Sequence, residues 1–243
     1  MTTIILFTDF GAEGPYIGQM QAVLQQQAPG VPVIDLLSNA PAGNPRLSAY
    51  LLAALRCFFP AQSIFLSVVD PGVGGPRAAV VVQADGQYFV GPDNGLFNTV
   101  ALQARNTKCW QIEWRPEHCS MSFHGRDLFA PVAARLATGT AEQLLKRGRL
   151  SGTEDWPADL PALIYFDHYG NAMTGLRYSD ALAGKKLRIA GGRELSQADT
   201  FCALPRGEPF WYNNSIGLVE IAVNRGSARD QLQLRPGMPV ELL

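Results

Sequence analysis

Two residues of opposite charge, Asp70 and Arg77, flank a glycine-rich loop in the segment VVDPGVGGPR. The apolar run IFLSVV ends at the aspartate, and Gly72, Gly74 and Gly75 follow within the loop. Glycine accepts a positive φ and lets a ligand approach the backbone closely. The same spacing also suits a plain turn closed by a local ion pair. The segment is therefore either a tight turn or the edge of a binding site.

A second group of polar residues, His124, Arg126 and Asp127, lies in SFHGRDLFAP, directly before a helical pattern. Asp127 suits a helix N-cap, and Arg126 suits a solvated neighbour. The imidazole of His124 can exchange a proton near neutral pH, although a single histidine is more often structural than catalytic. Taken alone, these residues indicate an α/β protein with a site for a small ligand.

The predicted elements explain how such residues could meet. TIILFTDF, VPVIDLL and SIFLSVVD predict strands, and YIGQMQAVLQQQAP and RLSAYLLAALRCFF predict the helices between them. AAVVVQADGQYFVGPDNG predicts a hairpin that turns at Asp85-Gly86. This alternation predicts an α/β sheet with helical layers on both faces. Ligands on such sheets bind beyond the carboxyl ends of the strands, where we expect Asp9 of TDFG to converge with Asp70.

The chain changes character after the helix predicted in RDLFAPVAARLATG. The stretch RGRLSGTEDWPADLPA is rich in proline, glycine and charge, and it predicts a domain boundary. We therefore expect an N-terminal α/β domain over residues 1–150 and a smaller C-terminal all-β barrel domain over residues 160–243. The strands predicted for the second domain are short: LIYFDHYGN, KLRIAG, TFCALP, LVEIAV, DQLQLRPG and PVELL.

Composition narrows the classes of function. Twenty basic residues nearly balance 21 acidic ones, and no basic run is present, so we expect a small-molecule substrate and no nucleic acid. No apolar stretch approaches the ~18 residues that span a bilayer, and the chain opens on a strand pattern, so we expect a cytoplasmic protein with no membrane contact. The four cysteines are widely spaced without a Cys-x-x-Cys pair, and the signatures of metal, dinucleotide and nucleotide sites are missing. We therefore expect no metal and no organic cofactor.

Six segments, taken in order, resemble one family: TDFG, VVDPGVGGPR, FVGPDNGLF, FHGRDLFAPVAA, DHYGN and NSIGLVEIAVN. These segments are similar to those of the S-adenosylmethionine hydroxide adenosyltransferases, the adenosine-forming S-adenosylmethionine hydrolases related to fluorinase and chlorinase. The resemblance runs from Thr8 to about Ala228. It implies an N-terminal α/β domain, a C-terminal β-barrel and a homotrimer. In that trimer, the substrate lies between the N-domain of one subunit and the C-domain of the next.

The family's Asp-Arg-His set falls on Asp70, Arg77 and His124, each within a matching segment. The resemblance implies that water, delivered as hydroxide, attacks the ribose 5′ carbon while methionine leaves and adenosine remains. Arg77 would favour the hydroxide form, and either Asp70 or His124 would accept the proton of the water. By this resemblance the glycine-rich loop is a site, with Asp70 and Arg77 at its two ends.

The resemblance also implies substrate-binding roles for seven further residues. Asp9 matches the acid that accepts hydrogen bonds from the ribose 2′ and 3′ hydroxyls. In the C-terminal domain, the resemblance implies that Asn171 and Phe201 contact adenine. Asp167 and Ser215 would hold the methionine amino and carboxylate groups. Glu220 and Val223 would lie on the same edge of the barrel.

The chain departs from the family pattern in a few places. Tyr169 stands where the family has phenylalanine, Gly175 replaces the asparagine after Thr174, and Ser122 replaces a threonine. The segment LSNAPAGNP replaces a histidine-containing stretch in the 37–45 loop. None of these departures touches the Asp-Arg-His set.

Two alternative functions are considered beside hydrolysis. One is a halogenase that uses chloride or fluoride on the same substrate, but the negative charge of Asp70 would repel a halide. The other is a non-catalytic protein that binds adenosine or S-adenosylmethionine. Pure binding needs no group that generates hydroxide, so the intact Asp-Arg-His set argues against it.

Overall fold

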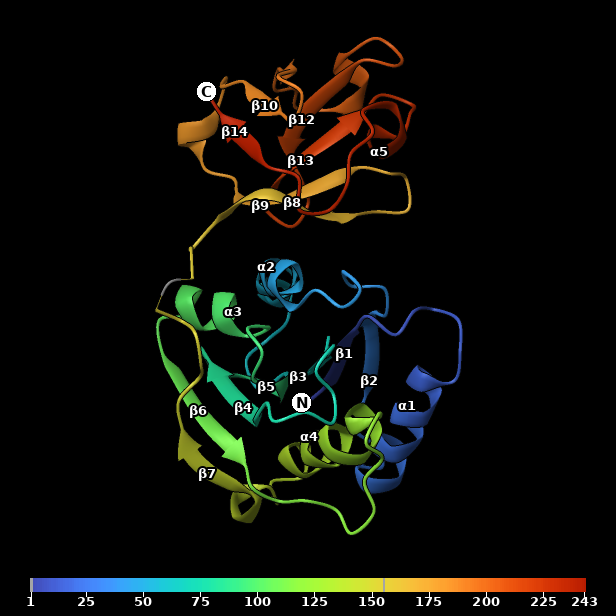
Figure 1. The fold of residues 1–243 in the computed structure, drawn as a ribbon, viewed down its shortest axis with the longest axis vertical. Helices are drawn as coiled ribbons and strands as arrows, with labels where there is room; N and C mark the ends of the chain where they lie inside the picture. Colours follow the sequence, from blue (N-terminus) through green and yellow to red (C-terminus); the bar gives the residue numbers. More distant parts are fainter. Residues whose placement is uncertain (1, 155) are drawn as a thin grey trace. The chain divides into compact units, whose positions relative to one another are not determined.

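The computed structural model describes residues 2–154 and 156–243. Met1 and Asp155 lie outside the described residues, and Asp155 falls within the predicted boundary stretch. The chain divides into two compact units, Met1–Trp156 and Pro157–Leu243 (Figure 1). Each unit has its own hydrophobic core.

The first unit is built on a seven-stranded sheet with the order β2-β1-β3-β5-β4-β6-β7. The pairs β1–β2, β1–β3 and β3–β5 are parallel, and the remaining pairs are antiparallel. The strands are β1 (Ile4–Thr8), β2 (Val33–Leu37), β3 (Ile64–Val68), β4 (Ala79–Ala84), β5 (Gln87–Pro92), β6 (Thr107–Ile112) and β7 (Leu145–Gly148). The predicted hairpin is confirmed as β4 and β5, with Asp85 and Gly86 both at positive φ in its turn.

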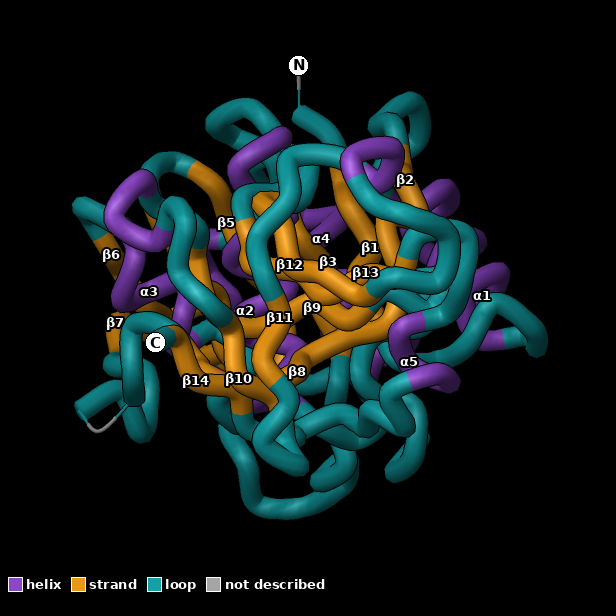
Figure 2. The backbone as a smooth tube through the Cα atoms, turned by 90° about the horizontal axis from the view of Figure 1, so that it is seen from above, coloured by secondary structure: helices purple, strands orange, loops and turns teal. Residues whose placement is uncertain are grey.

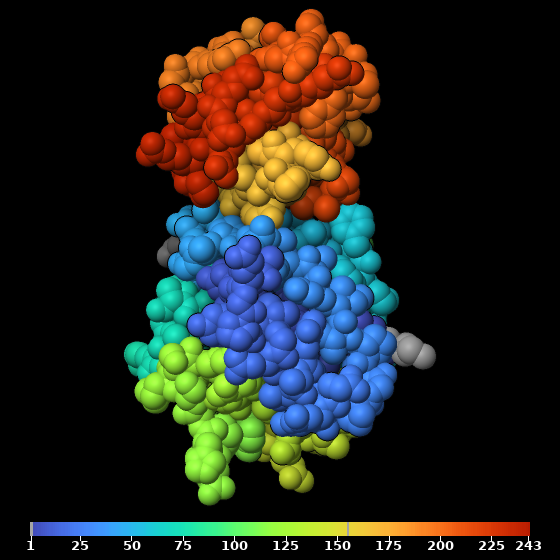
Figure 3. All heavy atoms as spheres, turned by 90° about the vertical axis from the view of Figure 1, so that its right-hand side faces the viewer, coloured from blue at the N-terminus to red at the C-terminus, as the bar shows by residue number. Residues whose placement is uncertain are grey.

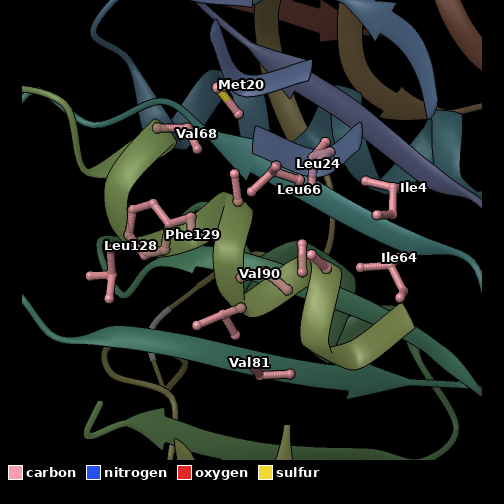
Figure 4. Close-up of a cluster of buried hydrophobic side chains, with 14 of the residues drawn as sticks. Ile4, Met20, Leu24, Ile64, Leu66, Val68, Val81, Val90, Leu128 and Phe129 are labelled. Atoms are coloured by element: carbon pink, nitrogen blue, oxygen red, sulfur yellow. The ribbon is translucent and has the colours of Figure 1, made fainter. Parts of the chain in front are cut away.

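Helices cover both faces of this sheet, as predicted. In Figure 1, α2 (Pro45–Leu55) and α3 (Asn98–Gln103) lie on one face, and α1 (Tyr16–Gln27) and α4 (Ala130–Ala137) lie on the other. The main core fills the space between the sheet and the second pair (Figure 4). Met20 and Leu24 of α1 are one helical turn apart and both are fully buried, which stabilises the unit by about 1.5–3 kcal/mol for each side chain.

The second unit contains two small sheets around one core. One has the order β12-β13-β9-β8 and the other β11-β10-β14, so the all-β character is confirmed. Figure 2 shows these strands separated by long loops, with only short helical turns. The strands are β8 (Leu160–Phe166), β9 (Ala172–Arg177), β10 (Leu187–Ile189), β11 (Glu194–Leu195), β12 (Pro209–Asn213), β13 (Leu218–Val223) and β14 (Val240–Leu242).

Two of the predicted strands in this unit are wrong. TFCALP contains the 3-10 turn η5 (Phe201–Ala203), in which Phe201 places its ring against Phe210 and Tyr212. DQLQLRPG begins within the short helix α5 (Ala228–Gln231), because the hydroxyl of Ser227 accepts a hydrogen bond from the backbone N–H of Asp230 and caps that helix.

Candidate active site

The carboxyl ends of β1 and β3 place two acids at one edge of the sheet. These strands are parallel neighbours with Thr8 paired to Val68, so Asp9 and Asp70 both lie just beyond their strands. Burial raises the pKa of Asp9, and the charge of Asp70 raises it further. The two carboxylates are therefore close enough to interact.

Arg77 joins the two ends of the glycine-rich loop. Its Nε donates to both carboxylate oxygens of Asp70, at 3.1 Å to Oδ1 and 2.9 Å to Oδ2, and its Nη2 also donates to Oδ2. The side chains are 11% exposed for Arg77 and 3% exposed for Asp70. The guanidinium also lies 5.2 Å from the ring centre of Phe129, a cation–π distance. Asp70 and Arg77 therefore form a largely buried ion pair that is joined by three hydrogen bonds, unlike an exposed surface pair.

The same guanidinium reaches His124, which is 47 positions away in the chain. Arg77 Nη2 lies 2.8 Å from His124 Nδ1. A guanidinium has only donors, so Nδ1 must be the acceptor, and the proton of the neutral imidazole must sit on Nε2. Burial lowers the pKa of His124, and the charge of Arg77 lowers it further. The structure therefore brings the predicted set together with a defined tautomer.

His124 stands at the start of a π-helical turn, η2 (Gly125–Phe129), that leads into α4. Such turns often occur at functional sites. Arg126 donates to Asp127 at 2.6 and 3.0 Å and to Gln19 of α1 at 2.7 Å, and Asp127 accepts the backbone N–H of Ser120 at 2.8 Å. Figure 3 shows this green segment on the surface beside the blue α1. The two residues therefore fix the His124 segment, where the sequence indicated only a helix cap and its neighbour.

The glycine-rich loop packs against the segment that carries His124. Gly74 has φ of +78°, and a Cβ at this position would lie 2.5 Å from the carbonyl oxygen of Met121. Within the loop, the backbone N–H of Val73 donates to the carbonyl of Asp70 at 3.2 Å, and that of Gly75 donates to the carbonyl of Gly72 at 2.9 Å. The loop is thus a tight turn that packs closely against the segment carrying His124.

Asp9 is held by the 37–45 loop, the segment that differs from the family pattern. The backbone N–H of Gly43 donates to Asp9 Oδ2 at 2.8 Å, which opposes the rise in the pKa of Asp9. The same loop bonds to both sides of Asp9, through Ala40 N–H to the Thr8 carbonyl (3.0 Å) and Gly11 N–H to the Ser38 carbonyl (2.6 Å). This loop therefore anchors the aspartate through backbone groups without a histidine.

The second unit contains a hollow of about 630 Å³. Four residues that the resemblance assigns to substrate binding line this hollow: Asp167, Asn171, Phe201 and Val223. The other lining residues are Tyr169, Tyr212, Arg225 and Gly226. The rings of Phe201 and Tyr212 lie 5.4 Å apart at 66°, so part of the wall is aromatic. A hollow of this kind suits a flat, largely apolar ligand with a few polar groups.

Glu220 lies behind that wall and is 2% exposed. Its Oε1 accepts from the hydroxyl of Tyr212 at 2.9 Å, and its Oε2 accepts from Asn214 Nδ2 at 2.6 Å. Burial raises the pKa of Glu220. Glu220 does not line the hollow itself, but it holds the hydroxyl of Tyr212, which does line it.

Ser215 is not brought to this hollow. It is exposed in the turn between β12 and β13, at the opposite end of β13 from Val223. Sequence reasoning did not single out Tyr212 and Arg225, which do line the hollow. The signal for Arg225 was weak: it precedes a glycine after a strand, and the structure gives it φ of +55°, rare for a residue other than glycine.

Other features can be stated for residues 2–154 and 156–243. Every helix in these ranges falls short of the length and apolar character that crossing a bilayer needs. No three His, Cys, Asp or Glu side chains in the described part of the chain gather as metal ligands would. The four cysteines are free thiols.

Comparison with known proteins gives matches over both units. The profile of the SAM hydroxide adenosyltransferase N-terminal domain matches residues 4–146, and that of the C-terminal domain matches residues 162–241. The chain is 39% identical to an (R)-S-adenosyl-L-methionine hydrolase of Thermus thermophilus, over 100% of both chains. It is 24% identical to a fluorinase of Actinopolyspora mzabensis, over 98% of this chain and 96% of the fluorinase. The crystal structure of an uncharacterized conserved protein from Thermotoga maritima superposes with a TM-score of 0.90 at 30% identity, over 99% of each chain.

Proposed function

The chain belongs to the SAM hydroxide adenosyltransferase family, and we propose on that basis that it hydrolyses S-adenosyl-L-methionine to adenosine and L-methionine. The observation that carries the proposal is the bonded set of Asp70, Arg77 and His124, with Asp9 at the same edge of the sheet. The hydrolases among the relatives bear the (R) descriptor, and we propose the same sulfonium epimer for this chain.

The reaction needs a strong nucleophile more than it needs an acid. The positive sulfonium makes methionine a neutral leaving group, so no proton has to be given to the departing sulfur. The C5′–O bond forms as the C5′–S bond breaks, and the bonding electron pair goes to sulfur. The protein must therefore place a water in line with C5′ and remove its proton by the time the bond has formed.

Arg77 and His124 offer hydrogen-bond donors for that water. Within the described part of the chain, neither Arg77 Nη1 nor the Nε2–H of His124 has a hydrogen-bond partner. A hydroxide has one more lone pair than water, so it can accept from both donors and still attack carbon. Two donors directed at one oxygen therefore favour the hydroxide form, as an oxyanion hole favours a developing negative charge.

The tautomer of His124 supports Asp70 rather than His124 as the proton acceptor. His124 Nδ1 already accepts from Arg77, and its Nε2 carries the proton, so His124 can take a second proton only by losing the bond from Arg77. Asp70 has only acceptor oxygens. We therefore assign proton acceptance to Asp70 and stabilisation of hydroxide to Arg77 and His124.

Binding of the substrate is proposed to involve both units. Asp9 would accept hydrogen bonds from the ribose hydroxyls. The aromatic hollow would bind the adenine. Asp167 and Ser215 would hold the amino and carboxylate groups of the methionine. We propose that the enzyme works as a homotrimer in which the N-terminal unit of one subunit and the C-terminal unit of the next share each substrate. We also propose that it acts in the cytoplasm and needs no metal or organic cofactor.

The test is a chromatographic assay of the purified protein with S-adenosyl-L-methionine in halide-free buffer, repeated with added chloride. We expect adenosine and methionine without halide. We expect turnover to fall by roughly 100- to 10,000-fold in Asp70→Ala, with adenosine binding nearly intact. A chlorinated nucleoside would assign the chain to the halogenases instead. Stabilisation by adenosine without turnover would indicate a binding protein.

A further inference from the structure

The carboxylate of Asp167 is bonded entirely within its own turn. Its Oδ1 accepts the backbone N–H of Tyr169 at 2.9 Å and that of Asn171 at 2.8 Å. Its Oδ2 accepts the side-chain Nδ2 of Asn171, also at 2.8 Å. The backbone N–H of Asp167 donates to the Asn171 carbonyl at 3.1 Å, which closes the turn. The four bonds fix Asp167 and Asn171 as one rigid unit.

These bonds decide which way the amide of Asn171 faces. A carboxylate can only accept, so the Asn171 NH₂ group must be directed at Asp167 and its carbonyl Oδ1 away from it. Among residues 2–154 and 156–243, no donor is bonded to Asn171 Oδ1. This oxygen is also not among the polar side-chain atoms that are fully buried without a hydrogen-bond partner, so a ligand can reach it. Asn171 is only 5% exposed and lines the hollow of the second unit. The hollow therefore receives a single fixed acceptor from this residue.

The remainder of the hollow suits a purine base. Phe201 and Tyr212 offer ring surfaces, and Val223 offers an apolar contact. The hydroxyl of Tyr212 donates to Glu220, so it does not compete for the polar edge of a ligand. A flat aromatic base that presents an amino group would satisfy both the rings and the fixed acceptor.

We propose that Asp167 is a positioning residue that orients the Asn171 amide and thereby sets the preference for an amino group over a carbonyl at purine position 6. This inference rests on the proposed function, because it takes the hollow to be the adenosine site. An inosine-type base would direct its carbonyl O6 at Asn171 Oδ1 and leave both acceptors unpaired. A buried unpaired polar group lowers affinity by roughly 5- to 100-fold, and we expect inosine to bind more weakly than adenosine by such a factor.

The test measures binding of adenosine and inosine to the full-length protein by calorimetry, in the wild type and in Asp167→Asn. The new side-chain oxygen would still accept the two backbone N–H groups, but its NH₂ would oppose that of Asn171. The Asn171 amide would then turn over and present its NH₂ to the hollow. We expect adenosine to bind more weakly, inosine to bind more tightly, and the preference to shrink at least tenfold or invert. Asp180→Asn, the same change at an exposed position of this unit, is the matched control and should bind as the wild type does.

A second measurement on the wild type keeps the proposal testable if the variant fails to fold. Purine riboside has no substituent at position 6, so it should bind between adenosine and inosine in affinity. An unchanged preference in a folded Asp167→Asn, or purine riboside binding no better than inosine, would overturn the inference. Hydrolysis of S-adenosyl-L-methionine by the wild type is measured separately. If the wild type prefers adenosine to inosine but does not hydrolyse S-adenosyl-L-methionine, the proposed function is contradicted and this inference still stands.

Discussion

Arg77 holds His124 in its neutral form, because Arg77 Nη2 donates to His124 Nδ1 across 2.8 Å and a second proton on the ring would oppose the guanidinium. Burial and this charge lower the pKa of His124 below its ordinary value of 6.5. The folded protein thus favours the neutral ring. The stability that this preference contributes is present above pH 6.5 and is lost as pH falls through the lowered pKa.

The first prediction concerns the pH dependence of turnover. Protonation of His124 would break the bond from Arg77, so we expect kcat to fall on an acid limb below pH 6.5. The asparagine side chain of His124→Asn can still accept from Arg77 near the position of Nδ1. It has no donor at the position of Nε2, and it cannot titrate. The variant should lose roughly 100-fold or more in kcat, and the acid limb should lose its His124 component. A pH–rate profile of the two proteins checks this, and the same limb in the variant would contradict it.

The second prediction concerns the ribose. Asp9→Asn keeps the shape of the side chain but removes the charge that accepts two hydroxyl hydrogen bonds, so adenosine should bind roughly 10- to 100-fold more weakly. The variant should lose less affinity for 2′-deoxyadenosine, which offers one hydroxyl fewer. Burial raises the pKa of Asp9, so wild-type affinity should begin to decline at a higher pH than an ordinary carboxyl would cause. Calorimetry with both nucleosides checks these outcomes, and equal losses for the two would contradict the ribose assignment.

The fold was more predictable from the sequence than the site was. The β-branched run TIILFT specifies β1, and the Asp85-Gly86 turn specifies the β4–β5 hairpin, because both signals are local. The strands β6 and β7 carry mixed polar sequences, TKCWQI and LKRG, near one edge of the sheet, and no pattern predicted them. TFCALP has the composition of a strand, but its aromatic contacts favour a 3-10 turn.

The chemistry-bearing residues could be found by type and resemblance, but their bonds could not. The contact between Arg77 and His124 joins residues 47 apart, and it alone fixes the tautomer that decides their roles. The sequence also gave no reason to connect Tyr212 with Glu220, whose pairing depends on the register of β12 against β13. Such tertiary contacts depend on packing rather than on local propensity.

The third prediction concerns the stability of the second unit. Asn214 Oδ1 accepts the backbone N–H groups of Ile216 and Leu218, so its amide cannot turn over, and its Nδ2 requires an acceptor at Glu220 Oε2. Glu220→Gln can keep the bond from Asn214 only by directing its NH₂ at the Tyr212 hydroxyl, which must then change from donor to acceptor and loses the acceptor of its own proton. We expect this change to lower the unfolding free energy by about 1–3 kcal/mol.

The pH dependence of that effect has a definite sign. Burial raises the pKa of Glu220, so its contribution to stability is fully present below the ordinary value of 4.5 and declines as pH rises through the raised pKa. The difference in unfolding free energy between the wild type and Glu220→Gln should therefore narrow from acid toward neutral pH. Denaturant titrations at several pH values measure it, and a difference that widened with pH would contradict the assignment.

The last prediction uses two glycines of the loop between Asp70 and Arg77. A Cβ on Gly74 would lie 2.5 Å from the Met121 carbonyl oxygen, and its φ of +78° disfavours any other residue. A Cβ on Gly72 would meet nothing closer than 3.9 Å, and its φ lies outside the left-handed region. Gly74→Ala should therefore displace the segment that carries His124 and lower kcat at least tenfold, whereas Gly72→Ala should change kcat by less than about threefold. Steady-state kinetics and melting temperatures of the matched pair give the answer. Equal effects of the two substitutions would show that the Gly74–Met121 contact does not position the histidine.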